Sequence, residues 1–165
     1  MRILVLSDTH IPSAAKVLPE IIAKEAKASD CCIHAGDFTN METLTALRGW
    51  TKVYAVCGNM DCKEIKETLP LKQVLPFEGF TFALTHGRGA PTIVTEYVKN
   101  EFAAVDAQID LFIHGHSHIP TDINIEGKAF FNPGSPTDST FTPYRSYGII
   151  EINNGQMQKR IVKIG

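Results

Sequence analysis

Residues 2–10 read RILVLSDTH, and they carry both the first fold signal and the first functional signal of the chain. The apolar run at residues 2–7 predicts a fully buried strand, because a short continuous apolar stretch is typical of a strand covered on both faces. A carboxylate and an imidazole follow at once, in Asp8 and His10. The same order, a buried strand and then polar side chains, recurs along the sequence.

Strands alternate with helices in the first half of the chain. We expect further strands at residues 31–35 and 52–57, and helices at residues 13–28 and 41–48. Pro19 lies near the first turn of the first helix, while Asn40 and Gly49 are typical of the start and the end of the second. This alternation favours parallel β-α units.

The second half is richer in strands. We expect a hairpin of residues 73–76 and 80–85 around Glu78-Gly79, a helix at 91–104 starting with Pro91, and strands at 110–114, 121–125, 128–131, 146–152 and 156–164. Asn153-Asn154-Gly155 is a good turn between the last two strands. The sum is a mixed α/β domain with more strands than a simple doubly wound sheet.

Length and composition limit the classes of protein that fit. A chain of 165 residues suits one domain, which we place at residues 1–165, and 44% hydrophobic with 21% charged residues disfavours disorder. The net charge of −2 gives no strong nucleic-acid signal. The first apolar run is too short for a secretory signal, and no stretch approaches the ~20 apolar residues of a membrane span. We expect a cytoplasmic protein without a membrane partner, and a homo-oligomer is compatible with the sequence.

The four cysteines form no CxxC pair. They are Cys31, Cys32, Cys57 and Cys62. The adjacent pair lies in an apolar run, so we expect reduced and mostly buried thiols. A thiolate metal site is the weaker alternative, because the usual ligand spacings are absent.

Ligand-type side chains follow five predicted strands. They are Asp8, His10, Asp37, Asn59, His86, His116 and His118. The carboxyl ends of strands are where α/β sheets build their sites. Oxygen and imidazole donors suit Mn, Fe, Ni, Zn or Co. The set is too large for one tetrahedral ion and fits two ions that share a bridging carboxylate.

Each of these residues alone has an ordinary structural explanation. A single Asp after a strand is usually a turn or cap residue, and a single His is usually exposed or satisfied in the core. Five strand ends with the same kind of residue make coincidence a poor explanation. His34 and His114 lie inside apolar runs instead, so we expect structural roles, with His114 also able to support a ligand from behind.

The order of these blocks resembles a known family. The blocks are Asp8-Thr9-His10, Gly36-Asp37, Gly58-Asn59, His86-Gly87 and Gly115-His116-Ser117-His118. Together they resemble the calcineurin-like metallophosphoesterases, and the size resembles their small single-domain bacterial and archaeal phosphodiesterase branch. Asn132-Pro133-Gly134-Ser135 resembles another block of that branch, where it lies near the site. The resemblance implies a four-layer α/β/β/α sandwich of two mixed β-sheets flanked by helices.

The resemblance also implies two divalent metal ions per chain. Asp8, His10, Asp37 and His118 would hold the first, and Asp37, Asn59, His86 and His116 the second, with Asp37 bridging. Manganese is the first expectation, with nickel, iron, zinc or magnesium as alternatives. Two such ions can lower the pKa of a shared water and clamp the oxygens of a small phosphate ester. Asp37, Asn59 and His86 are the expected catalytic residues.

One position departs from the family pattern. Many members carry His after Gly-Asn, as the proton donor to the leaving group, whereas here the residue is Met60, which cannot donate a proton. Losing a general acid costs about 10²–10⁴ in rate for a poor leaving group, so we expect a preference for activated diesters. Asp61 is either a helix cap or an orienting group in the pocket. Arg88 either contacts phosphate or is an exposed loop residue, and Tyr144 and Arg145 stay outside the catalytic set.

Three functions remain open. A metal-dependent phosphodiesterase is preferred, because all seven ligands are intact. A catalytically weak protein-interaction scaffold is the alternative, since the resemblance includes a eukaryotic retromer subunit that uses this fold in that way. A phosphomonoesterase or a nuclease is the third, and the ligands do not separate it from a phosphodiesterase.

Overall fold

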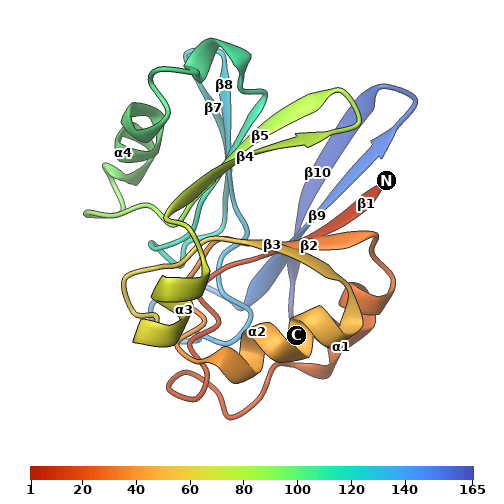
Figure 1. The fold of residues 1–165 in the computed structure, drawn as a ribbon, viewed down its shortest axis with the longest axis vertical. Coiled ribbons are helices and arrows are strands. Elements are labelled where there is room, and N and C mark those ends of the chain that lie inside the picture. The colour runs from red at the N-terminus through yellow and green to blue at the C-terminus, as the bar shows by residue number, and fades with distance from the viewer.

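The structure is a computed structural model and describes residues 1–165 apart from the side chain of Ala107. Two five-stranded mixed sheets form its centre (Figure 1). The first sheet has the order β10-β9-β1-β2-β3, with β1 (Arg2–Leu6), β2 (Cys31–His34), β3 (Lys52–Ala55), β9 (Ser146–Asn153) and β10 (Gln156–Lys163). The second has the order β4-β5-β6-β8-β7, with β4 (Lys72–Phe77), β5 (Phe80–Thr85), β6 (Leu111–Ile113), β7 (Thr121–Ile125) and β8 (Lys128–Asn132).

Helices cover the outer face of each sheet. They are α1 (Glu20–Lys27), α2 (Met41–Trp50), α3 (Lys63–Thr68) and α4 (Val94–Glu101), with a short 3-10 turn, η1 (Asp106–Gln108). Figure 1 shows α1 and α2 against the first sheet and α4 outside the second. The predicted four-layer α/β/β/α sandwich is confirmed.

Alternation along β1 explains why the first sheet is buried on both faces. Ile3 and Val5 belong to the core between the sheets, together with Phe82 and Phe131 of the second sheet. Leu4 and Leu6 point the other way, into the core under α1 and α2. Successive strand residues face opposite sides, so one apolar run serves two cores. Each fully buried Leu or Val stabilises the fold by roughly 1.5–3 kcal/mol.

The register brings the ends of the parallel strands together. Leu6 pairs with His34, and His34 pairs with Ala55, so β1, β2 and β3 end at one edge. In the second sheet Ile113 pairs with both Leu84 and Phe131, so β5, β6 and β8 also end together. The loops after these strands can therefore contribute to one site.

Three predicted helices had wrong bounds. The helix expected at 13–28 begins at Glu20, because Pro19 precedes it with an extended ψ of 140° and an X-Pro step disfavours helix before it. The helix expected to end before Gly49 continues to Trp50, and that expected at 91–104 spans only Val94–Glu101. Asn40 caps α2 as predicted, accepting a hydrogen bond from Thr43 N.

Both predicted hairpin turns are confirmed. Glu78 and Gly79 have φ of 44° and 91°, and Asn154 and Gly155 have φ of 52° and 73°. Two successive residues of positive φ are what a tight two-residue hairpin requires. All four cysteines, which lie within the described residues, are free thiols, and three are buried. Within the described part of the chain, no helix has the length and apolarity needed to cross a membrane.

Candidate metal centre

The loops after β1, β2, β3, β5 and β6 carry the seven predicted ligands to one place. Five of these residues have left-handed backbone, with φ of 54° at Asp8, 41° at His10, 60° at Asp37, 70° at His116 and 57° at His118. That conformation costs roughly 1–2 kcal/mol for an ordinary L-residue, and it is tolerated best by Asn, Asp and His. Such strain collects at functional sites, where the surrounding structure enforces it.

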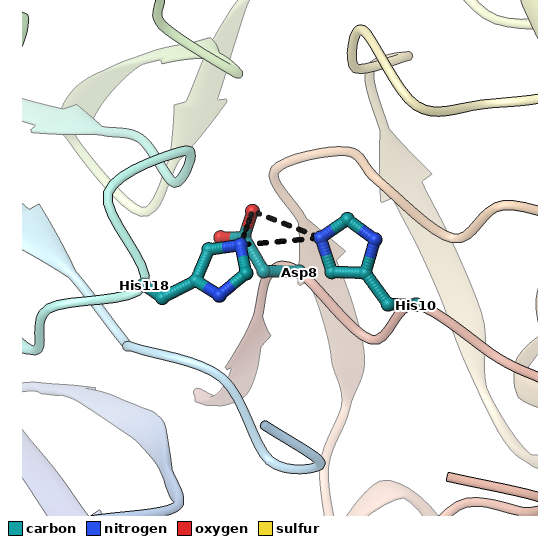
Figure 2. A group of neighbouring side chains, drawn as sticks. All are labelled: Asp8, His10 and His118. Carbon is teal, nitrogen blue, oxygen red and sulfur yellow. Dashed lines mark hydrogen bonds and ion pairs between the residues drawn. The ribbon is translucent and has the colours of Figure 1, made fainter. Parts of the chain in front are cut away.

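Asp8, His10 and His118 form the first of two ligand groups (Figure 2). Asp8 Oδ1 lies 3.4 Å from His118 Nε2 and 3.8 Å from His10 Nε2. The two imidazole nitrogens lie 3.2 Å from each other. Figure 2 shows both rings turning these nitrogens toward the carboxylate. One carboxylate and two imidazoles in this arrangement could hold a divalent cation.

Asp8, Asp37 and His86 form the second group found among the described residues. Asp37 Oδ2 lies 3.3 Å from His86 Nε2 and 3.4 Å from His10 Nε2, so one oxygen faces histidines of both groups. Asn59 Oδ1 lies 3.1 Å from His86 Nε2 and 3.1 Å from His116 Nδ1. All seven predicted residues are therefore brought together. The two groups share Asp8, whereas the resemblance implied only Asp37 as the shared ligand.

The electrostatics favour ionised carboxylates. Asp8 is fully buried, which works to raise its pKa, but the hydrogen bond to His10 and the charges of His86 and His118 bring it down to about 2. Burial works to lower the pKa of His86, and the hydrogen bond to Asp37 with the charges of Asp8 and Asp37 raises it to about 9. Burial works to raise the pKa of Asp37, but the hydrogen bond to His86 and the charge of that histidine lower it. Buried charges need such partners or a cation, so the donor set fits a divalent metal.

Asp61 clamps the loops that carry Asp37 and Asn59. Its carboxylate accepts hydrogen bonds from the backbone N–H groups of Gly58 at 2.7 Å, Thr39 at 2.8 Å and Asp37 at 3.1 Å. It does not cap α3, whose N-cap residue is Cys62. Of the two roles predicted for Asp61, the helix cap is wrong, and the residue orients backbone rather than lining the pocket.

Two glycines are required by close approaches. A Cβ on Gly58 would lie 2.1 Å from Asp37 Oδ1, and one on Gly115 would lie 1.7 Å from Ser7 Oγ. The next residue, His116, donates its backbone N–H to both oxygens of Asp8, at 3.2 and 3.1 Å. The glycine between the histidines thus lets the loop after β6 pack directly on the loop after β1.

His34 and His114 lie behind the ligands and in neither group. His34 stacks on Phe38 with ring centroids 3.5 Å apart, and its Nδ1 accepts a hydrogen bond from Gly36 N at 3.2 Å. Burial lowers the pKa of His34 to about 3 and that of His114 to about 4. His114 Nδ1 lies 3.1 Å from the carbonyl of Gly115. Both are neutral core residues, in line with the structural roles that the sequence predicted for them.

The segment from Asn132 to Asp138 braces the site from behind. Asn132 Nδ2 donates to Gly115 O at 3.1 Å, and Ser135 Oγ donates to Asp8 O at 2.7 Å. At its end, an oxygen of Asp138 lies 2.5 Å from His118 Nδ1. Sequence reasoning missed Asp138, and the available signal was its place three residues after the recognised Asn132-Pro133-Gly134-Ser135 block.

A cleft of about 450 Å³ opens over the ligands. It is lined by five ligand candidates, His10, Asp37, Asn59, His116 and His118, and by the apolar residues Met60, Pro91, Ile119 and Phe141. Met60 is 60% exposed and Phe141 75% exposed. The cleft therefore offers charged ligands at the bottom and apolar contacts at the mouth.

Arg88 lines a neighbouring cavity, whereas Tyr144 and Arg145 lie near the C-terminal end of the chain. The Arg88 guanidinium packs 4.2 Å from the ring centre of Tyr97, on the wall of a cavity of about 580 Å³ that Asn59 and His86 also line. Arg145 donates to Gly165 O, and Lys163 lies over the ring of Tyr144. Tyr144 and Arg145 thus contact the C-terminal end of the chain.

Comparison with known proteins places this site in a family context. The profile described as the calcineurin-like phosphoesterase superfamily domain matches residues 1–155. A probable metallophosphoesterase of Methanothermobacter thermautotrophicus is 33% identical over 165 residues, covering 100% of this chain and 94% of that protein. Another from Methanocaldococcus jannaschii is 34% identical over 142 residues, covering 83% and 69%.

Solved structures share the architecture. A Thermotoga maritima protein solved by NMR has a TM-score of 0.77 at 31% identity, with 99% of each chain covered. Entamoeba histolytica Vps29 in complex with Zn²⁺ has a TM-score of 0.77 at 24% identity, also covering 99% of each. An archaeal phosphodiesterase has a TM-score of 0.70 at 22% identity, covering 98% of this chain and 100% of that one. At these identities the last two show a common fold.

Proposed function

This chain belongs to the calcineurin-like phosphoesterase superfamily, and from that premise we propose that it is a phosphodiesterase that uses two divalent metal ions. Membership supports metal-dependent hydrolysis of a phosphoester. One observation carries the dinuclear proposal: Asp37 Oδ2 lies within 3.4 Å of His10 Nε2 and 3.3 Å of His86 Nε2. A single carboxylate oxygen between histidines of two ligand groups is suited to bridge two ions.

The proposed ligand sets are those that the family resemblance implies, and the contacts of Asp37 and Asn59 with the histidines support them. Asp8, His10, Asp37 and His118 would hold one ion, and Asp37, Asn59, His86 and His116 the other. Bound there, the ions would supply Lewis acidity for activating water and neutralising phosphate oxygens. The imidazoles and oxygens of this set accept several first-row ions, with manganese as our first expectation.

The chain's own residues would orient the phosphate. Asn59 turns its Oδ1 toward His86 and His116. Its amide nitrogen is then the donor placed to bind a phosphate oxygen on the cleft side. The buried carboxylates of Asp8 and Asp37 would offset half of the charge that two divalent ions bring. The positive charge that remains would attract an anionic phosphate ester.

Two features of the cleft mouth favour a diester over a monoester as substrate. Met60 lies there without a proton to give, so the leaving group must depart as a stable anion or take its proton from solvent. Ile119 and Phe141 line the same cleft and can contact the second organic group that a diester carries. A monoester would leave this apolar wall in water.

A metal add-back assay tests the proposal. Protein stripped with a chelator receives Mn²⁺, Ni²⁺, Zn²⁺ or Mg²⁺ and is assayed on bis(p-nitrophenyl) phosphate and on p-nitrophenyl phosphate. We expect metal-restored hydrolysis that favours the diester and falls at least 10²-fold in Asp37→Asn. Asp122→Asn is the matched control, because Asp122 is exposed and pairs with Lys159 in β10. Two bound ions without hydrolysis of either ester would refute the enzyme proposal.

A binding scaffold is the second candidate. The likeness to Vps29 fits this alternative through fold alone. The observation that favours it is an apolar cavity of about 420 Å³ beside α1 and α2, lined by Val17, Leu18 and Trp50 among others. Val17 is 73% exposed, so it adds apolar surface at the rim of this cavity that a partner could cover. The intact ligand set favours the enzyme, and the assay above separates the two.

A further inference from the structure

Asp138 is a buried carboxylate aimed at one metal-ligand candidate. It lies in the loop after β8 and is 5% exposed. Its Oδ2 lies 2.5 Å from His118 Nδ1. The backbone N–H of Thr140 donates to Asp138 Oδ1 at 2.7 Å, and Asp138 donates its own N–H to Ser135 Oγ at 2.9 Å. The carboxylate is therefore held in place by hydrogen bonds with the protein itself.

The two nitrogens of His118 face different partners. Nδ1 meets Asp138, whereas Nε2 lies 3.4 Å from Asp8 Oδ1 and 3.2 Å from His10 Nε2. A neutral imidazole carries one N–H and one lone pair, and only the lone pair can bind a cation. A carboxylate accepts but cannot donate, and Asp138 at 2.5 Å is within hydrogen-bond distance of Nδ1 whereas Asp8 is 3.4 Å from Nε2, so the proton of a neutral His118 belongs on Nδ1. The lone pair then lies on Nε2, in the first ligand group.

We propose that Asp138 is a positioning residue of the metal centre, which fixes the ring orientation and the tautomer of His118 so that Nε2 can bind the first ion. The inference rests on the metal binding of the proposed function but requires no hydrolysis. His86 shows the contrast, because its Nδ1 contacts the backbone carbonyl of Ala35 at 2.7 Å instead of a carboxylate. The partner of His118 is thus a side chain that a substitution can remove, whereas the partner of His86 is a backbone carbonyl.

The same segment ties this histidine to its neighbours in the group. Thr137 Oγ1 donates to Thr9 O at 2.7 Å, and Ser135 Oγ donates to Asp8 O at 2.7 Å. The segment that ends in Asp138 therefore holds the backbone of the β1 loop and the ring of His118 together. Partners of this kind behind metal ligands typically contribute 10–100-fold to metal affinity.

The first test measures metal binding directly. Mn²⁺ is titrated into chelator-stripped wild type, Asp138→Ala and Asp138→Asn in a calorimeter, with Asp122→Asn as the surface control. We expect Asp138→Ala to weaken one of the two ions roughly 10–100-fold and to leave the other within about threefold. Asp138→Asn keeps only one oxygen, which can accept from Thr140 N or from His118 but not from both in the wild-type arrangement, so it should be intermediate, and it serves if the alanine variant does not fold. Unchanged affinity for both ions in a folded variant would overturn the proposal.

The second test reads the tautomer. The ¹⁵N shifts of the His118 ring are recorded near pH 10 in the metal-free protein, with His118→Gln used for assignment. We expect a proton on Nδ1 in wild type and a shift toward Nε2–H in Asp138→Ala. A purely structural role would lower thermal stability without moving these signals. If wild type binds ions but hydrolyses no ester, while Asp138→Ala still changes affinity and tautomer, the proposed function fails and this inference stands.

Discussion

The carboxylate of Asp61 accepts a hydrogen bond from the backbone N–H of Asp37, the candidate bridging ligand 24 residues away, at 3.1 Å. The same side chain bonds Thr39 N and Gly58 N, so it joins the loops after β2 and β3. Asp61 is 4% exposed. The buried carboxylate of Asp61 accepts from three backbone donors and thus fixes the position of Asp37, without being one of the ligand candidates itself.

Replacing Asp61 should therefore destabilise the protein even without metal. Asp61→Ala leaves three backbone N–H groups without their acceptor, and each buried unsatisfied group costs about 1–3 kcal/mol. We expect the free energy of unfolding in urea to fall by roughly 3 kcal/mol or more, and by less in Asp61→Asn, which keeps one acceptor. Asp122→Asn should stay within about 0.5 kcal/mol of wild type. A loss below about 1 kcal/mol in Asp61→Ala would contradict the clamp.

Gly115 offers a second test, of the contact between the β1 and β6 loops. An added Cβ would lie 1.7 Å from Ser7 Oγ and 2.6 Å from Asp8 Oδ2, so the loops must separate. We expect Gly115→Ala to weaken Mn²⁺ binding at least tenfold and to lower the free energy of unfolding by about 2 kcal/mol.

Gly49→Ala is the matched control for that change. Gly49 lies inside α2, and a Cβ there meets nothing within 4 Å. Alanine is the better helix former, so this variant should gain up to about 1 kcal/mol and bind Mn²⁺ like wild type. Equal metal affinity in both alanine variants would show that the close approach at Gly115 is unimportant.

The seven ligand candidates could be predicted because their signal is local. Each follows a short apolar run, and parallel strands bring their carboxyl ends to one edge whatever the details of packing. The turn at Glu78-Gly79 was equally predictable, since Gly79 readily adopts the positive φ that such a two-residue turn uses. Strand ends differed from prediction by only one or two residues, for example at Ser146–Asn153.

Other features depend on contacts between distant segments. Asp138 meets His118 across 20 residues of chain, and its place after the Asn132-Pro133-Gly134-Ser135 block indicates closeness to the site but not which histidine it contacts. The role of Asp61 was ambiguous because a residue before a helix is usually a cap, whereas here three backbone donors from folded loops compete for it. The helix expected at 13–28 begins only at Glu20, because Pro19 lies just before its first turn and disfavours helix in the residue that precedes it.

The buried neutral histidines predict a pH dependence of stability. Burial lowers the pKa of His34 to about 3, against about 6.5 in an unfolded chain. The unfolded state therefore takes up a proton that the folded state refuses, and stability falls as the pH drops from about 6.5 toward 3. The slope approaches about 1.4 kcal/mol per pH unit for each such histidine. His114, with its pKa lowered to about 4, adds to it.

Urea unfolding of metal-free protein between pH 6.5 and 4.5 isolates this effect. The raised pKa of His86, about 9, acts in another window, since that contribution is full below about 6.5 and lost as the pH rises toward 9. The lowered pKa of Asp8, about 2, matters only below about pH 4. His34→Gln should reduce the slope by about half. Phe38→Leu, which removes the stacked ring, should lower stability alike at every pH; an unchanged slope in His34→Gln would refute the assignment.

Met60 yields the prediction that bears most directly on the chemistry. It lines the cleft over the ligands, it is 60% exposed, and its backbone N–H donates to Asp37 Oδ1 at 2.8 Å. Because that bond uses the backbone, Met60→His should keep it and add a proton donor at the cleft mouth. We expect hydrolysis of a methyl p-nitrophenyl diester, whose good leaving group needs no acid, to change less than threefold. Hydrolysis of a dialkyl diester should rise at least tenfold, toward the ~10²–10⁴ that a general acid contributes.

The gain should vanish above the pKa of the new imidazole, and Met60→Gln, which is similar in size but not an acid, should show none. An equal effect of Met60→His on both esters would mean that the leaving group is not limited by protonation in this protein.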